Sequence, residues 1–133
     1  LKQMIAQKRL QNNVELTGKI TDPDKLRLFY SSCDIYISAS EKEASPMPPL
    51  EAMSCGKSLL LYDIEAHNDI IKSSQAGETF SSKNPVDICR KIDFIYKNKE
   101  VFGKHARKFA ESHDWEIVCN NLIEIYNKFL KNS

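Results

Sequence analysis

The chain has 133 residues, of which 41% are apolar and 28% charged, and its formal net charge is +1. This length suits one domain with a single core, and the near-neutral charge gives no electrostatic reason to expect a nucleic acid or an anionic membrane as partner. No apolar run approaches the roughly 20 residues of a membrane span and no signal peptide is visible, so we expect a cytoplasmic protein. The four cysteines are far apart, without a C-x-x-C pair, which predicts reduced, mostly buried thiols rather than metal ligands or disulfides.

The first third of the chain predicts two helices and a strand. Residues 1–13 carry spaced apolar side chains typical of a helix, and Val14–Ile20 reads as a strand. Asp22 caps the following helix, and Pro23 takes its first position, where a missing N–H costs nothing. The apolar face of that helix consists of Leu26, Phe29 and Tyr30.

The central stretch runs from a strand through a proline-rich loop into a helix. Ile35–Ile37 is a short apolar strand, Pro49–Met53 opens a helix, and Gly56 ends it. Glu43 therefore lies in the loop and Glu51 in the first helical turn. Ligands of open α/β sheets bind at the carboxyl ends of parallel strands. The two carboxylates are therefore the candidate site.

The chemistry of these acids favours hydroxyl groups as their partners. A helix N-terminus attracts phosphate, but Glu51 would repel a phosphate and can instead accept hydrogen bonds from a neutral hydroxyl. The prolines leave few amide donors in this stretch, namely those of Ser45, Met47, Leu50 and Glu51. Taken singly, Glu51 could be a structural helix charge and Glu43 a solvated loop residue.

The next segment predicts two further strands and a helix between them. Ser58–Tyr62 is continuously apolar, as in a strand covered on both faces, and Glu78–Phe80 is a short last strand. A helix begins near Ala66. We interpret His67 as a capping or surface residue rather than a catalytic base, because nothing in the sequence pairs it with a nucleophile.

Residues 84–131 predict three C-terminal helices. Asn84 caps the first, the second covers residues 100–112, and Asp114 caps the third. We expect their apolar positions to be core residues rather than a binding stripe. These positions are Ile88, Cys89, Ile92, Ile95 and Tyr96; Phe102, Ala106, Phe109 and Ala110; and Val118, Leu122, Ile125, Tyr126 and Phe129.

Glu43 and Glu51 enclose seven residues, and Ala52–Lys57 follow them. This arrangement resembles the E-x7-E signature of the retaining glycosyltransferases of family 4, the GT-B "group 1" family. Flanking segments resemble the same family: Val14–Ile20, Asp24–Ser38, Lys57–Asp63 and His113–Glu116. The resemblance covers nearly the whole chain.

The resemblance implies an α/β fold, a Rossmann-like doubly wound parallel sheet with helices on both faces. Residues 1–133 would form a single, partial C-terminal domain that binds a nucleotide-sugar donor. The family's first strands and diphosphate-clamping loop are not present before Leu1. A saccharide or lipid-linked acceptor would bind through a missing N-terminal domain, and membrane association at the inner face would also depend on that domain. We therefore expect the chain alone to transfer no sugar.

The resemblance also implies roles for individual residues. Glu43, as the catalytic candidate, contacts hydroxyls of the donor sugar, and Glu51 accepts from the ribose. Pro46 stands where many members have glycine, and Pro48–Leu50 resembles a variant found in transferases of cell-surface polysaccharides. The implied donor-binding residues are Gly18, Ile20, Glu43, Ser45, Pro46, Met47 and Glu51.

The sequence also allows a metal site and two functions other than glycosyl transfer to be considered. Asp22–Asp24 matches a D-x-D pattern that holds a divalent cation in other glycosyltransferases, but a helix cap explains it, and we expect neither metal nor cofactor. A receiver-like signalling domain needs an aspartate at a strand end, whereas Asp34 precedes its strand and Ser38 ends it. The second alternative function, a nucleotide-binding module without transferase activity, is not excluded by the sequence.

Overall fold

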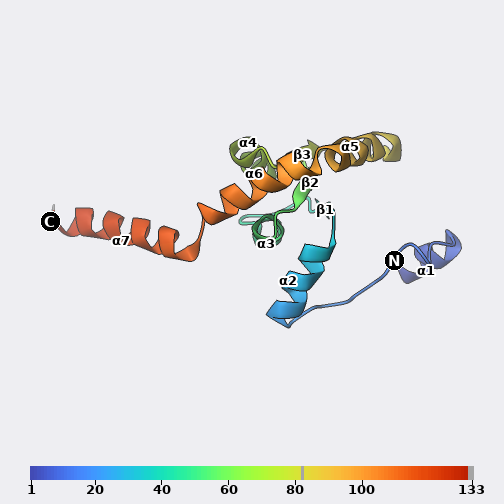
Figure 1. Ribbon diagram of the computed structural model, residues 1–133, viewed down its shortest axis with the longest axis horizontal. Helices are drawn as coiled ribbons and strands as arrows, with labels where there is room; N and C mark the ends of the chain where they lie inside the picture. The colour runs from blue at the N-terminus through green and yellow to red at the C-terminus, as the bar shows by residue number, and fades with distance from the viewer. Residues whose placement is uncertain (82, 132–133) are drawn as a thin grey trace.

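A computed structural model of the chain describes residues 1–81 and 83–131. Among these residues, three parallel strands form one sheet in the order β1-β2-β3 (Figure 1). The strands are β1 (Ile35–Ser38), β2 (Ser58–Tyr62) and β3 (Gly77–Phe80). In the register of the sheet, Leu59 of β2 pairs with Tyr36 on one side and Gly77 on the other.

The described helices are α1 (Lys2–Gln7), α2 (Pro23–Ser32), α3 (Met47–Ser54), α4 (Glu65–Ser74), α5 (Pro85–Lys97), α6 (Lys99–Glu111) and α7 (Trp115–Lys131). Helix α3 connects β1 to β2, and α4 connects β2 to β3. Because the strands are parallel, their carboxyl ends meet at one edge of the sheet. The loops that enter α3 and α4 therefore lie beside each other.

Helices cover both faces of the sheet. Leu59 and Leu61 of β2 are buried in a cluster with residues of α2, α3, α4 and α6. Leu60, which points the opposite way, is buried with residues of α5 and with Phe80. This arrangement confirms the predicted doubly wound α/β fold, with β2 as the strand covered on both faces.

Several helix boundaries follow from the local signals in the sequence. The Asp22 carboxylate accepts from the N–H groups of Asp24 and Lys25, at 3.0 and 3.3 Å, so it caps α2. Asn84 caps α5 in the same way. Gly56 follows α3 with φ of +68°, a left-handed conformation that favours glycine after a helix.

The expectation of a strand over Val14–Ile20 is wrong. These residues have no regular secondary structure, and Val14 and Leu16 remain 39% and 43% exposed. A strand needs a neighbour to pair with, and none of the described strands pairs with this segment. The helix expected over residues 1–13 is also shorter, since α1 ends at Gln7 and buries no residue.

Helix α7 does not contribute to the core as predicted. It extends away from the sheet (Figure 1), and its apolar positions Val118, Leu122, Ile125, Tyr126 and Phe129 are all exposed. In α5, Cys89 and Tyr96 are exposed as well, whereas Ile88, Ile92 and Ile95 pack inward. A helical apolar pattern identifies the face that can be buried, but the pattern alone does not supply a partner.

The prediction of mostly buried thiols is also wrong. Cys33 and Cys55 are half-buried, and Cys89 and Cys119 are exposed; all four are free. None of the described helices is both long and apolar enough to cross a membrane.

Candidate functional site

The loop between β1 and α3 carries Glu43 at the carboxyl edge of the sheet. Its first turn is held by two hydrogen bonds, from the Ser40 amide to the Ser38 hydroxyl at 3.3 Å and from the Ser40 hydroxyl to the Lys42 carbonyl at 3.2 Å. Glu43 is exposed. It lines a hollow of about 390 Å³, the Glu43 hollow, together with Glu41, Lys42, Ala44, Ile64, Glu65, Ala66 and Asp69.

Helix α3 begins two residues earlier than its sequence suggests. Met47 is its first residue, so Glu51 lies in the second turn and not in the first. A helix leaves its first four N–H groups without a partner inside the helix. Pro46, Pro48 and Pro49 occupy three of these four positions, so Met47 provides the one free amide of this helix start.

The Glu51 carboxylate is held by a neighbouring helix. The Tyr30 hydroxyl of α2 donates to its Oε2 at 3.0 Å. Burial raises the pKa of Tyr30 well above its ordinary value, and the hydrogen bond to Glu51 raises it further. Tyr30 therefore stays a protonated donor to a half-buried carboxylate.

Tyr36 of β1 lies within electrostatic reach of both acids. Burial raises the pKa of its phenol, a hydrogen bond with Ser38 acts in the opposite direction, and the charges of Glu43 and Glu51 raise it again. Both acids thus act on the same phenol, although Glu43 and Glu51 line different hollows.

Gly18 and Ile20 lie in a second hollow of about 370 Å³, the Gly18 hollow. It is lined by Thr17, Gly18, Ile20, Leu26, Phe29, Tyr30, Cys33, Tyr36 and Ile37. Both tyrosines near Glu51 line this hollow. The segment before α2 therefore shares a hollow with Tyr30, the hydrogen-bond partner of Glu51, without being a strand.

Ser45, Met47 and Glu51 share a third hollow of about 420 Å³ with the junction of α6 and α7, the Trp115 hollow. Its remaining lining residues are Leu50, Ser54, Ala110, His113, Asp114, Trp115 and Val118. Pro46 itself is buried as the N-cap residue of α3. The predicted site residues therefore lie along three hollows rather than one.

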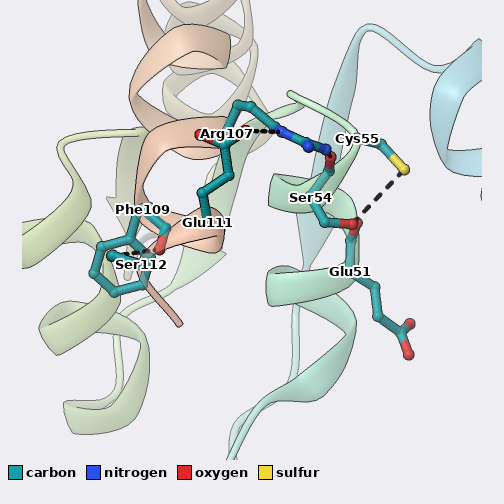
Figure 2. A network of polar contacts seen from close by, with 7 residues as sticks. All are labelled: Glu51, Ser54, Cys55, Arg107, Phe109, Glu111 and Ser112. Atoms are coloured by element: carbon teal, nitrogen blue, oxygen red, sulfur yellow. Dashed lines mark hydrogen bonds and ion pairs between the residues drawn. The ribbon is translucent and has the colours of Figure 1, made fainter. Parts of the chain in front are cut away.

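The far end of α3 is anchored to α6 (Figure 2). Arg107 of α6 donates through Nη1 to the Ser54 carbonyl at 2.5 Å and through Nε to Glu111 at 2.7 Å. The Ser54 hydroxyl donates to the Glu51 carbonyl at 2.7 Å. Figure 2 shows the Glu51 side chain pointing away from α6, so this anchor fixes the backbone of α3 and leaves the carboxylate to Tyr30.

The sequence patterns give Tyr30 and Tyr36 no part in the site: they predict Tyr30 in an apolar helix face and Tyr36 in a buried strand. Tyr30 is buried, but its hydroxyl donates to Glu51. Tyr36 is only half-buried, since β1 has no fully buried residue, and the charges of both acids raise the pKa of its phenol. Nothing local signals this, because Tyr30 and Glu51 are 21 residues apart and belong to different helices.

His67 is neither a surface residue nor a base facing a nucleophile. It is fully buried, and its Nδ1 donates to the Tyr62 carbonyl at 2.7 Å. Its Nε2 has no hydrogen-bond partner among the described residues. The expectation of a capping or surface histidine is wrong because α4 packs this side chain against the end of β2.

The described residues contain no group of three or more His, Cys, Asp or Glu side chains that could hold a metal ion. Asp22 and Asp24, the D-x-D pair, lie at the start of α2, where the Asp22 carboxylate is engaged by backbone amides. The structure therefore shows the helix cap that the sequence predicted there.

The sequence model of the glycosyl transferases group 1 family matches residues 1–113, so the chain belongs to this family. An N-acetylgalactosaminyltransferase of Campylobacter jejuni that acts on N,N'-diacetylbacillosaminyl-diphospho-undecaprenol is 29% identical over 76% of this chain. The sulfoquinovosyl transferase of Arabidopsis thaliana is 33% identical over 74% of it. This chain spans only 28% and 21% of the lengths of these two relatives.

A solved structure supports the fold. Sucrose-phosphate synthase from Thermosynechococcus elongatus, a GT-B glycosyltransferase, superimposes with a TM-score of 0.84 over 99% of this chain and 34% of its own, at 18% identity. The family match and this likeness confirm the predicted resemblance. They place the chain among glycosyltransferases rather than receiver-like signalling domains.

Proposed function

We propose that this chain is the donor-binding part of a retaining glycosyltransferase, and that residues 1–133 form one partial GT-B C-terminal domain. One observation carries the proposal: the loop that leaves the carboxyl end of β1 carries Glu43 and enters α3, where the Glu51 carboxylate accepts from Tyr30 at 3.0 Å. Ligands of open α/β sheets bind at this edge. A nucleotide-sugar offers hydroxyl groups at both its sugar and its ribose, and a carboxylate accepts from each.

In this proposal the two acids divide the donor between them. The exposed carboxylate of Glu43 accepts from hydroxyls of the donor sugar, and its negative charge stabilises the positive charge that develops there as the bond to diphosphate breaks. Glu51 accepts from the ribose hydroxyls. The nucleobase lies in the Gly18 hollow, against Gly18 and Ile20.

The loop Ser45–Met47 approaches the sugar and the diphosphate. Since Met47 provides the one free amide of the α3 start, this helix contributes little to holding the phosphates. We therefore assign the main diphosphate clamp to a part of the protein outside these 133 residues. The enzyme needs no metal ion or cofactor in this proposal.

The acceptor is a saccharide or a lipid-linked saccharide, and the product a polysaccharide or glycolipid. The named substrate of the Campylobacter relative is a diphospho-undecaprenol-linked sugar, which supports this class. Acceptor binding, and any association with the inner face of a membrane, belong to the part of the protein outside this chain. The protein itself is cytoplasmic, and the 133 residues alone transfer no sugar.

The test uses the full-length protein that carries this chain. Calorimetric titration with UDP, GDP and ADP should show binding of at least one. Product NMR with the matching nucleotide-sugar should show retention of the anomeric configuration, and a chelator should not abolish transfer. The assignment fails if no nucleoside diphosphate binds or if the product is inverted. Transfer by the 133-residue chain alone would show that the missing parts are not needed.

A further inference from the structure

Tyr30 connects the two halves of the proposed nucleoside site. The residue is 8% exposed and lines the Gly18 hollow, and its hydroxyl donates to Oε2 of Glu51 at 3.0 Å. We propose that Tyr30 is a positioning residue that holds the Glu51 carboxylate in place for the ribose of the bound nucleotide. This inference rests on the proposed donor-binding function.

The Glu51 side chain needs such a partner. It is half-buried in the second turn of α3, and among the described residues no cation lies within ion-pairing distance of it. A glutamate loses rotational freedom when it is fixed by a ligand, which weakens binding. A donor that fixes the carboxylate beforehand reduces this loss.

Tyr30 can act as a rigid donor because the core fixes its ring. The ring contacts Tyr36 with 6.0 Å between centroids and Phe29 with 6.5 Å. It is also part of the buried cluster that contains Ala52 and Met53 of α3. The position of its hydroxyl is therefore set by the packing of α2 against α3.

The bond to Tyr30 leaves acceptor capacity for a ligand. A carboxylate has two oxygens with about four lone-pair sites, and the one hydrogen bond of the Glu51 carboxylate among the described residues is to Oε2. Oε1 can accept from a ribose hydroxyl while Oε2 stays with Tyr30. Because Tyr30 also lines the Gly18 hollow, the same side chain aligns this contact with the place of the base.

The experiment is a double-mutant cycle in the full-length protein. Wild type, Tyr30→Phe, Glu51→Gln and the double variant are titrated with whichever of UDP, GDP and ADP binds the wild type most tightly. Tyr30→Phe should weaken binding about 3- to 10-fold, as expected for one hydrogen bond. The double variant should bind no more weakly than Glu51→Gln alone, because the effect of Tyr30 passes through Glu51.

Tyr62→Phe is the matched control. It removes the same hydroxyl from a tyrosine that packs on the opposite face, where this group makes no hydrogen bond among the described residues. Its affinity should equal that of the wild type. Urea unfolding of each variant separates lost stability from lost affinity.

Four results would overturn the inference. Tyr30→Phe with unchanged affinity, whatever its stability, makes Tyr30 merely structural. An effect of Tyr30→Phe that adds fully to that of Glu51→Gln shows that Tyr30 does not act through Glu51. A wild type that binds none of the three nucleotides overturns the proposed function, and this inference with it. Normal nucleotide binding by Glu51→Gln overturns the ribose role of Glu51 and hence the role of Tyr30.

Discussion

Glu43 and Glu51 have different surroundings although they belong to one loop and helix. Glu43 is exposed beside Glu65 and Asp69 in the Glu43 hollow. Glu51 is half-buried, lines the Trp115 hollow and accepts a hydrogen bond from Tyr30, which lines the Gly18 hollow. The difference supports the proposed division, with the sugar at the open acid and the nucleoside at the anchored one.

Substituting each acid should therefore affect a different measurement. In the full-length protein, Glu51→Gln should weaken nucleoside diphosphate binding, because a hydrogen bond to a charged group is worth about 1.5–3 kcal/mol, or roughly 10- to 150-fold. Glu43→Gln should leave that affinity nearly unchanged and lower turnover by a similar factor, since its partner is on the sugar. Calorimetry with nucleoside diphosphate and a transfer assay with the full donor measure the two effects.

Glu100→Gln is a suitable control, since Glu100 is exposed on α6 and lines none of the three hollows that contain predicted site residues. If both site variants behave like this control, the acids are structural or solvated. If Glu43→Gln alone loses nucleotide affinity, the two roles are reversed.

At the scale of elements, the packing of α3 on α6 sets the position of the site. The amino end of α3 carries the site, while its carboxyl end meets α6 at two places. Arg107 bonds to the last turn through the Ser54 carbonyl, and Gly103 approaches the turn at Gly56. A Cβ on Gly103 would stand 2.5 Å from the Gly56 carbonyl oxygen. The two backbones are thus as close as a glycine permits.

Gly103→Ala tests this contact, because helix propensity and packing predict opposite signs. In a helix interior, alanine is favoured over glycine by about 1 kcal/mol. The clash with the Gly56 carbonyl should outweigh this gain and destabilise the protein by about 1–3 kcal/mol, as overpacking does. Urea unfolding measures the change. Lys104→Ala, at the next and exposed position, should change stability little; a Gly103→Ala variant more stable than wild type would refute the close packing.

At the scale of the molecule, the sheet and its helices form one body from which α1 and α7 project (Figure 1). The apolar residues of α7 are exposed along its length. Trp115, at its start, is the single tryptophan of the chain and is 70% exposed. It nevertheless lines the hollow that contains Met47 and Glu51. Its fluorescence can therefore report on both the shape of the chain and its site.

For the 133-residue chain we expect emission at the long wavelengths of a tryptophan in water and strong quenching by acrylamide. The physical reason is the exposed indole at the start of a helix that projects from the body. Unfolding in urea should shift the emission only slightly, whereas far-UV circular dichroism follows the loss of helix. A short-wavelength, protected emission would instead show that α7 packs onto the sheet.

The sequence by itself determined the features that depend on neighbouring residues. Asp22 and Asn84 cap helices because their side chains reach amides two or three residues ahead. Ser58–Tyr62 is a strand covered on both faces, because a continuous apolar run leaves no polar face to point toward water. The E-x7-E spacing indicated the family because it combines a strand end, a loop and a helix start in one segment.

Only the tertiary structure decided which elements find a partner. Val14–Ile20 has strand-like residues, but none of the described strands pairs with it. Helix α7 has an apolar face that stays exposed, with no other element of residues 1–81 and 83–131 covering it. The hydrogen bond from Tyr30 to Glu51, the burial of His67 and the close approach of Gly103 to Gly56 also join residues brought together by folding. The physical reason is that periodicity and capping act within a few residues, whereas burial and pairing depend on which surfaces meet in space.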